Sequence, residues 1–124
     1  MPTVSVSPAL LDDLPTIVGL LADDIFGQGR ENIGPSLHSD YFDGFEAIDD
    51  DPNQVFVVFK AEGVIIGCLQ LSFIPGPSRQ GTWRGQIESV RVSSEKRGVG
   101  LGQEMINWAI DTCLDRGCRI IQLT

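Results

Sequence analysis

The stretch EKRGVGLGQE, which begins at Glu95, combines glycines and basic residues in a pattern that suits anion binding. Its relevant members are Lys96, Arg97, Gly98, Gly100 and Gly102. Backbone without Cβ atoms can approach a ligand closely, and the free N–H groups in a helix's first turn attract negative charge. The pattern therefore favours a phosphate-bearing ligand, although a tight strand-to-helix turn that binds nothing would use the same glycines.

The spacing of these glycines excludes two other phosphate-binding motifs. A dinucleotide fingerprint G-x-G-x-x-G that started at Gly98 would need glycine where Gln103 stands. One that started at Gly100 would need glycine in place of Met105, and the phosphate loop G-x-x-x-x-G-K-[ST] is absent.

The flanking sequence places the glycines between a strand and a helix. The run WRGQIESVRV (residues 83–92) predicts a long strand. After the glycines, apolar residues recur at helical spacing until Arg116, and Gly117 gives a stop signal. A strand, a glycine turn and a helix that begins near Gly98 form the layout of an anion site.

The other expected elements complete a mixed α/β layer structure. In chain order they are a strand at 3–6, a helix at 7–25, a short helix at 36–51, antiparallel strands at 54–60 and 63–73, and a strand from 118. The helix at 7–25 is expected to start with Ser7 as its cap and to be kinked at Pro15.

Length and charge narrow the classes of function. The chain has 124 residues, enough for one domain, and its net charge of −8 argues against a nucleic-acid partner. A leader sequence and a membrane-spanning run are both absent, so we expect a cytoplasmic protein with no membrane partner. The three cysteines lack metal-ligand spacing and are expected to be buried thiols rather than redox or metal groups, and no metal is expected.

The segment from Ile87 onward, IESVRVSSEKRGVGLGQEMINWAIDTCLDRGCRIIQLT, resembles the central part of the GNAT N-acetyltransferases. Their signature [RQ]-x-x-G-x-[GA] is met by Arg97, Gly100 and Gly102, and the runs SVSPALLDDLPTIVGLLADD and GCLQLSF are also similar to the family. The resemblance implies an α/β (α+β) fold with a mixed, mostly antiparallel sheet flanked by helices. Strands four (86–92) and five (118–123) would be splayed to admit coenzyme A.

The resemblance also implies a coenzyme site. The loop and helix N-terminus would bind the pyrophosphate of acetyl-coenzyme A (acetyl-CoA) through backbone N–H groups of 97–102. The pantetheine arm would run beside 89–92 and pair with the backbone as an added strand does. The implied coenzyme-binding residues are Val90, Arg91, Val92, Arg97, Gly98, Val99, Gly100, Leu101 and Gly102.

Acetyl transfer to an amine requires a base, and Glu88 is the candidate. Strand alternation predicts that Glu88 shares a face with Val90 and Val92, so that partial burial would raise its pKa. Many GNAT relatives carry an acidic residue at this strand position. The alternative is a structural carboxylate bonded to neighbouring backbone or to Arg84. The general acid stays unassigned, because Tyr41 does not match the position of the family's tyrosine.

These observations lead to an expected function with two rivals. The expectation is an N-acetyltransferase that moves the acetyl group from acetyl-CoA to a primary amine of a small molecule or peptide by direct attack. A coenzyme-binding or sensory module with weak or no catalysis is the first rival, and a small α/β interaction domain is the second. Residues 1–124 would be one domain that is cut short within or after the fifth strand, and the exposed apolar surface would favour a homodimer.

Overall fold

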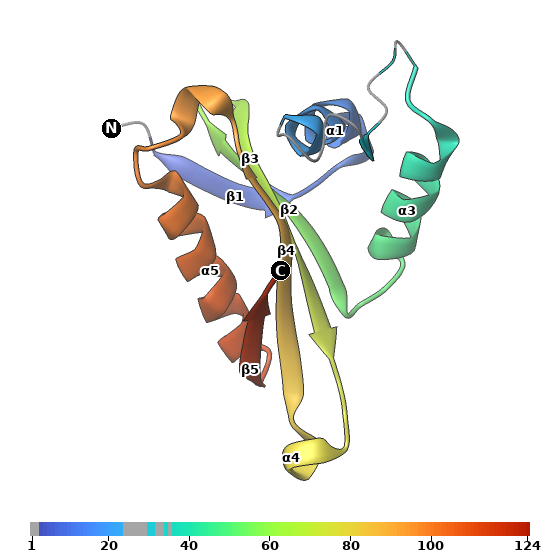
Figure 1. The fold of residues 1–124 in the computed structure, drawn as a ribbon, viewed down its shortest axis with the longest axis vertical. Coiled ribbons are helices and arrows are strands. Elements are labelled where there is room, and N and C mark those ends of the chain that lie inside the picture. Colours follow the sequence, from blue (N-terminus) through green and yellow to red (C-terminus); the bar gives the residue numbers. More distant parts are fainter. Residues whose placement is uncertain (1–2, 24–29, 32–33, 35) are drawn as a thin grey trace.

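The protein folds around a single five-stranded sheet (Figure 1). The computed structural model describes residues 3–23, 30–31, 34 and 36–124. The strands lie in sequence order, β1-β2-β3-β4-β5. The first three pairs are antiparallel and the pair β4–β5 is parallel. This mixed, mostly antiparallel sheet flanked by helices confirms the predicted fold class.

The elements follow the predicted order. They are β1 (Val4–Pro8), a 3₁₀ turn η1 (Leu11–Asp13), α1 (Leu14–Ala22), α3 (Ser39–Asp49), β2 (Gln54–Ala61), β3 (Val64–Ile74), the short α4 (Ser78–Gly81), β4 (Trp83–Val92), a 3₁₀ turn η2 (Ser94–Lys96), α5 (Leu101–Asp115) and β5 (Cys118–Leu123).

The predicted start of the first helix is wrong. The Ala9 N–H donates to the Phe56 carbonyl at 2.9 Å, so the chain stays on the sheet beyond Pro8. The Leu10 N–H then donates to the Asp13 carboxylate at 2.8 Å, and α1 begins only at Leu14. Pro15 consequently lies in the first turn of α1, where its missing N–H costs nothing, and causes no kink.

The sole histidine of the chain lies at the start of a helix. His38 is the N-cap of α3, and its Nδ1 accepts a hydrogen bond from the Asp40 N–H at 3.2 Å. It therefore satisfies one of the N–H groups that a helix leaves free at this end.

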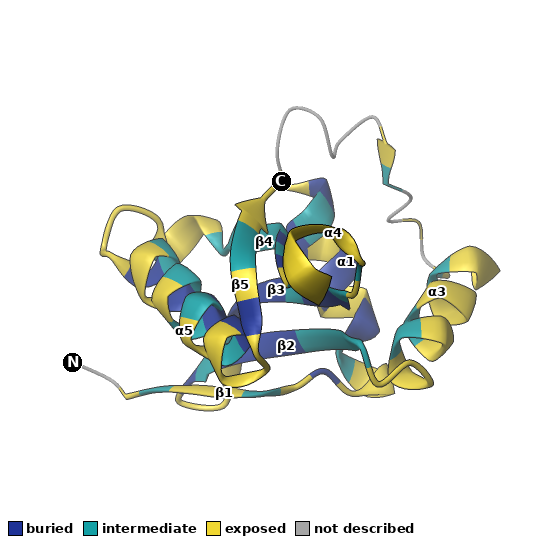
Figure 2. Ribbon diagram, turned by 90° about the horizontal axis from the view of Figure 1, so that it is seen from below, coloured by how far each residue is buried: buried dark blue, intermediate teal, exposed yellow. Residues whose placement is uncertain are grey.

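The sheet separates two layers of helices. Helix α5 packs on β3, β4 and β5, whereas α1 packs on β3 and β4 and α3 packs on β2 from the other face (Figure 1). Burial concentrates on the inner strands and on the side of α5 that faces them (Figure 2). The buried residues of α5 are Leu101, Met105, Ala109 and Cys113.

Two strand glycines fix the position of α5. A Cβ at Gly67 would lie 2.7 Å from Met105 Sδ, and a Cβ at Gly85 would lie 2.5 Å from Cys113 Sγ. Both distances are shorter than van der Waals contact, so only glycine lets the helix pack this closely on β3 and β4. The close packing sets where the N-terminus of α5 meets the end of β4.

Candidate functional site

The glycine stretch forms the turn between β4 and α5. Gly98 (φ 84°) and Gly100 (φ 89°) adopt the left-handed conformation that other residues rarely accept. Gly100 is the N-cap of α5, and the Glu104 N–H donates to its carbonyl at 3.2 Å. The three N–H groups before Glu104 therefore have no acceptor within the helix and are available to a ligand.

Space is open above this turn. A Cβ at Gly98 or Gly100 would meet no atom within 4 Å, and one at Gly102 would meet only Val92 Cγ2, at 3.9 Å. Gly102 has an ordinary helical backbone, so neither strain nor crowding within the fold explains its glycine. Glycine there instead leaves room for a ligand to reach the helix end, which fits the predicted pyrophosphate.

A β-bulge interrupts β4 next to this turn. Cys68 pairs with Arg91 and Gln70 pairs with Glu88, so two residues of β4, Ser89 and Val90, oppose one residue of β3. Ser89 has φ 55°, which is unusual for a residue with a side chain. Bulges of this kind redirect side chains and often adjoin functional sites.

The bulge overturns the prediction that Glu88 shares a face with Val90 and Val92. Paired residues of an antiparallel ladder point to the same side, so Glu88 lies with Gln70 on the α1/α3 face. Val90 and Val92 pack instead against the core cluster beneath α5. The extra residue shifts the two-residue period by one, and simple alternation cannot anticipate such a shift.

The opening between β4 and β5 is shorter than predicted. The two strands pair through Ile87 and Leu123, and the Thr124 N–H donates to the Ile87 carbonyl at 2.9 Å. Gln86 is therefore paired with Gln122, contrary to the predicted splay from residue 86.

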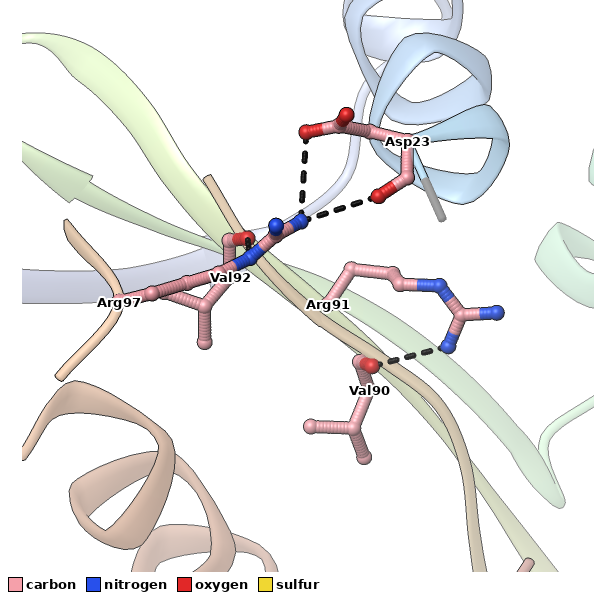
Figure 3. A network of polar contacts seen from close by, with 5 residues as sticks. All are labelled: Asp23, Val90, Arg91, Val92 and Arg97. Atoms are coloured by element: carbon pink, nitrogen blue, oxygen red, sulfur yellow. Dashed lines mark hydrogen bonds and ion pairs between the residues drawn. The ribbon is translucent and has the colours of Figure 1, made fainter. Parts of the chain in front are cut away.

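Two arginine side chains donate hydrogen bonds to carbonyl groups of β4 (Figure 3). Arg91 donates to the Val90 carbonyl at 2.9 Å, and Arg97 Nε donates to the Val92 carbonyl at 3.2 Å. Each carbonyl oxygen has a second lone pair, so the predicted pairing of a pantetheine arm with this strand needs no break of these bonds.

The Arg97 side chain points away from the glycine turn. Its guanidinium bonds to the carbonyl and the carboxylate of Asp23, the C-cap of α1 (Figure 3). The guanidinium therefore does not add its charge to the glycine turn, contrary to expectation. Lys96 does line two neighbouring cavities of about 460 Å³ each.

Glu88 is held by neutral groups rather than by Arg84 or backbone. Its Oε1 accepts from Gln86 Nε2 at 3.3 Å and lies 3.4 Å from the Ser72 hydroxyl. Its Oε2 has no hydrogen-bond partner within the described part of the chain. A half-buried carboxylate with one free oxygen can accept a proton from an amine or a water. Ser72 and Gln86 are not among the residues predicted from the sequence, although their polarity within apolar strand runs is a visible signal.

A small cavity of about 190 Å³ lies on the α1/α3 face. It is lined by Gln70, the strand partner of Glu88, by Ser89, and by Asp40 and Tyr41 of α3, together with apolar residues. The Tyr41 hydroxyl donates to Glu31 Oε1 at 2.8 Å. We expected an acceptor site where residues 27–39, the second helix and residues 75–82 meet the end of β4. Residues 75–82 lie instead at the start of β4 (Figure 1), and 27–29, 32–33 and 35 fall outside the described residues.

The cysteines are buried free thiols, as predicted. Burial raises the pKa of Cys68 to about 12, against a lowering effect of Arg91. Burial also raises the pKa of Cys113 to about 11, and the adjacent Cys118 adds to the rise. Thiols that stay protonated are poor nucleophiles, so an acyl-cysteine step has no support here. The described residues contain no helix long and apolar enough to span a membrane.

Comparison with known structures identifies the same architecture in other proteins. A transcriptional regulator from Bacillus halodurans is 39% identical, with a TM-score of 0.94 over 98% of this chain and 81% of that one. The glucosamine-6-phosphate N-acetyltransferase of Arabidopsis thaliana is 26% identical, with a TM-score of 0.78 over 98% and 82% of the two chains.

A third structure, a predicted acetyltransferase with acetyl-CoA from Clostridium acetobutylicum, shares the fold. Its TM-score is 0.76 at 17% identity, over 98% of this chain and 80% of that one. A search of curated proteins finds no match. The model of the Acetyltransferase (GNAT) family matches residues 21–124, which include the bulged strand, the glycine turn and α5. The chain belongs to the GNAT acetyltransferase family.

Proposed function

We propose that the protein is an N-acetyltransferase that moves an acetyl group from acetyl-CoA to a primary amine of a small molecule or peptide. The observation that carries the proposal is the open first turn of α5, with its glycines, directly after the bulged strand β4. The helix end suits a pyrophosphate, and the bulged strand beside it suits an extended amide-bearing arm. The fold shared with a structure that contains acetyl-CoA supports the same coenzyme.

The residues of the chain would have the following roles in the reaction. Backbone N–H groups at 97–102 would hold the pyrophosphate, and the β4 backbone at Val90 and Val92 would orient the pantetheine arm. Glu88 would accept the proton of the amine through Oε2, directly or through water. A backbone N–H near Val90 would stabilise the oxyanion that develops during attack. Amine and coenzyme would be bound together, without a covalent enzyme intermediate.

A second candidate function is a coenzyme-binding sensory module with little catalysis. It is favoured by the 39% identity to a protein described as a transcriptional regulator. Such a module would keep the glycine turn and the β4 edge but would not need the free Oε2 of Glu88. Glu88 is half-buried and its Oε2 has no hydrogen-bond partner among the described residues, which favours the enzyme.

Calorimetric titration of the 124-residue chain with acetyl-CoA, compared with CoA, tests the proposal. We expect saturable one-to-one binding of both, followed by CoA release when a panel of primary amines is added. Binding without CoA release would favour the sensory module. A folded chain that binds neither ligand would contradict both functions.

A further inference from the structure

A line of polar side chains crosses the α1/α3 face of the sheet. The register pairs Gln54 with Ser72, Ser72 with Gln86, and Gln86 with Gln122. Cross-strand partners point to the same side, so these four residues form one row over four strands, which we call the polar row. The neighbouring row holds Glu88.

Hydrogen bonds join the polar row to Glu88. Gln54 Oε1 lies 2.9 Å from the Ser72 hydroxyl, which is also 3.4 Å from Glu88 Oε1. The Gln70 amide donates to Gln54 Oε1 at 3.0 Å, and the Gln86 amide donates to Glu88 Oε1 at 3.3 Å. The candidate base and the polar row therefore form one network.

This network keeps unused hydrogen-bonding capacity. The Nε2 group of Gln54 and the Oε1 atoms of Gln70 and Gln86 have no partners among the described residues. Each side-chain amide offers two donors and an acceptor with two lone pairs. Gln54 and Gln86 are half-buried and Ser72 is 6% exposed, although all three lie on inner strands of the sheet. Water reaches half-buried side chains, and these donors and acceptors can exchange that water for the hydroxyl groups of a polar ligand.

We propose that the polar row binds hydroxyl groups of the acceptor, which makes the acceptor a small hydroxylated primary amine. This inference rests on the proposed function. With its amine at Glu88 Oε2, such a molecule extends along the sheet towards Gln86 and Gln54 and exchanges hydrogen bonds with their amides. Most residues that line the cavity of about 190 Å³ are apolar, and Gln70 is the one member of the hydrogen-bonded network among them.

Serinol and isopropylamine provide a matched pair of probes, because isopropylamine is serinol without its two hydroxyl groups. In the ¹⁵N-labelled chain saturated with CoA, serinol should shift the side-chain amide signals of Gln54 and Gln86, and isopropylamine should leave them in place. If serinol shifts backbone signals near Glu88 but none of these side-chain signals, the inference is overturned.

Kinetics provide a second readout. The kcat/KM ratio of serinol to isopropylamine should fall about fivefold in Gln86→Leu and in Gln54→Leu, the effect of one lost hydrogen bond. Comparing the ratio between variants cancels the different basicities of the two amines. Asn107→Leu makes the same kind of change on the exposed surface of α5 and should leave the ratio unaltered.

The outcomes separate the two proposals. Acetyl-CoA binding by Gln86→Leu and Gln54→Leu shows that the variants fold. If both amines are acetylated and neither variant changes the kcat/KM ratio of serinol to isopropylamine, the polar row does not bind the acceptor. The proposed acetyltransferase function then still stands. A chain that binds no acetyl-CoA overturns the proposed function, and the inference falls with it. If acetyl-CoA binds without transfer, unshifted Gln54 and Gln86 amide signals overturn the inference.

Discussion

Arg97 and Asp23, which are 74 residues apart in the sequence, meet through two hydrogen bonds. The Arg97 guanidinium lies 3.0 Å from the Asp23 carbonyl and 3.2 Å from its carboxylate. The same guanidinium donates to the Val92 carbonyl. One side chain thus connects the end of α1, the end of β4 and the glycine turn, and so couples the two sides of the candidate site.

Asp23→Ala should alter this connection with little effect on folding. Both side chains are about half exposed, and exposed pairs contribute roughly 0–1 kcal/mol. We expect the free energy of unfolding in urea to fall by less than about 1 kcal/mol, since the bond to the Asp23 carbonyl remains. Asp111→Ala, on the exposed side of α5, is the control. A loss above about 2 kcal/mol would mean that the pair organises α1 as well.

Glu88→Gln should lower the rate of acetyl transfer while coenzyme binding is retained. The amide keeps the shape and can still accept from Gln86, but it cannot take a proton from the amine. Loss of a general base typically costs about 10²–10⁴-fold in rate. The measurement is kcat for CoA release, with acetyl-CoA affinity by calorimetry as the control. Unchanged kcat at neutral pH would make Glu88 a structural carboxylate.

Gly102→Leu should weaken acetyl-CoA binding at least about tenfold, the equivalent of 1.4 kcal/mol. The leucine side chain would enter the space above the first turn of α5, where only Val92 lies near. Gly102→Ala is the matched control, because the family signature accepts alanine at this position. Calorimetry gives the affinity and urea unfolding the stability. Equal affinity in both variants would place the ligand elsewhere.

Gly85→Ala should destabilise the fold by about 1–3 kcal/mol, the usual effect of overpacking. The added Cβ would lie 2.5 Å from Cys113 Sγ and 2.9 Å from its Cβ, so α5 must move away from β4. Gly44→Ala in α3, where nothing lies within 4 Å, should instead stabilise by about 0.5–1 kcal/mol. Urea unfolding measures the stability of both variants. Equal stability of the two variants would contradict the close packing of α5.

Alkaline pH should destabilise the fold through the buried thiols. The pKa of Cys68 rises from 9.0 to about 12 in the folded state, so the native state holds its proton where the unfolded chain releases it. The free energy of unfolding is therefore unaffected below pH 9 and decreases as pH rises from there towards 12. Urea unfolding between pH 8 and pH 10.5 should show a smaller decrease for Cys68→Ala. If the free energy of unfolding decreased equally with pH in both proteins, burial of this thiol would be contradicted.

The site shows where sequence reasoning succeeds and where it stops. The bounds of β4, the end of α5 at Gly117 and the glycine turn between them follow from local preferences, which short stretches of sequence express directly. The bulge at Ser89 does not, because nothing in ESVRV marks which residue is left unpaired. The predicted face of Glu88 was wrong for that reason.

The sequence by itself determined the order of the elements, the family and the turn that leaves the N-terminus of α5 open, since all three depend on residues close together in the chain. Only the tertiary structure decided the face of Glu88, the Arg97–Asp23 connection, the fit of α5 over Gly67 and Gly85, and the polar row. These features join residues from different strands and helices. Strand register and helix packing bring such residues together, and both arise from the energy of the whole fold rather than from any local pattern.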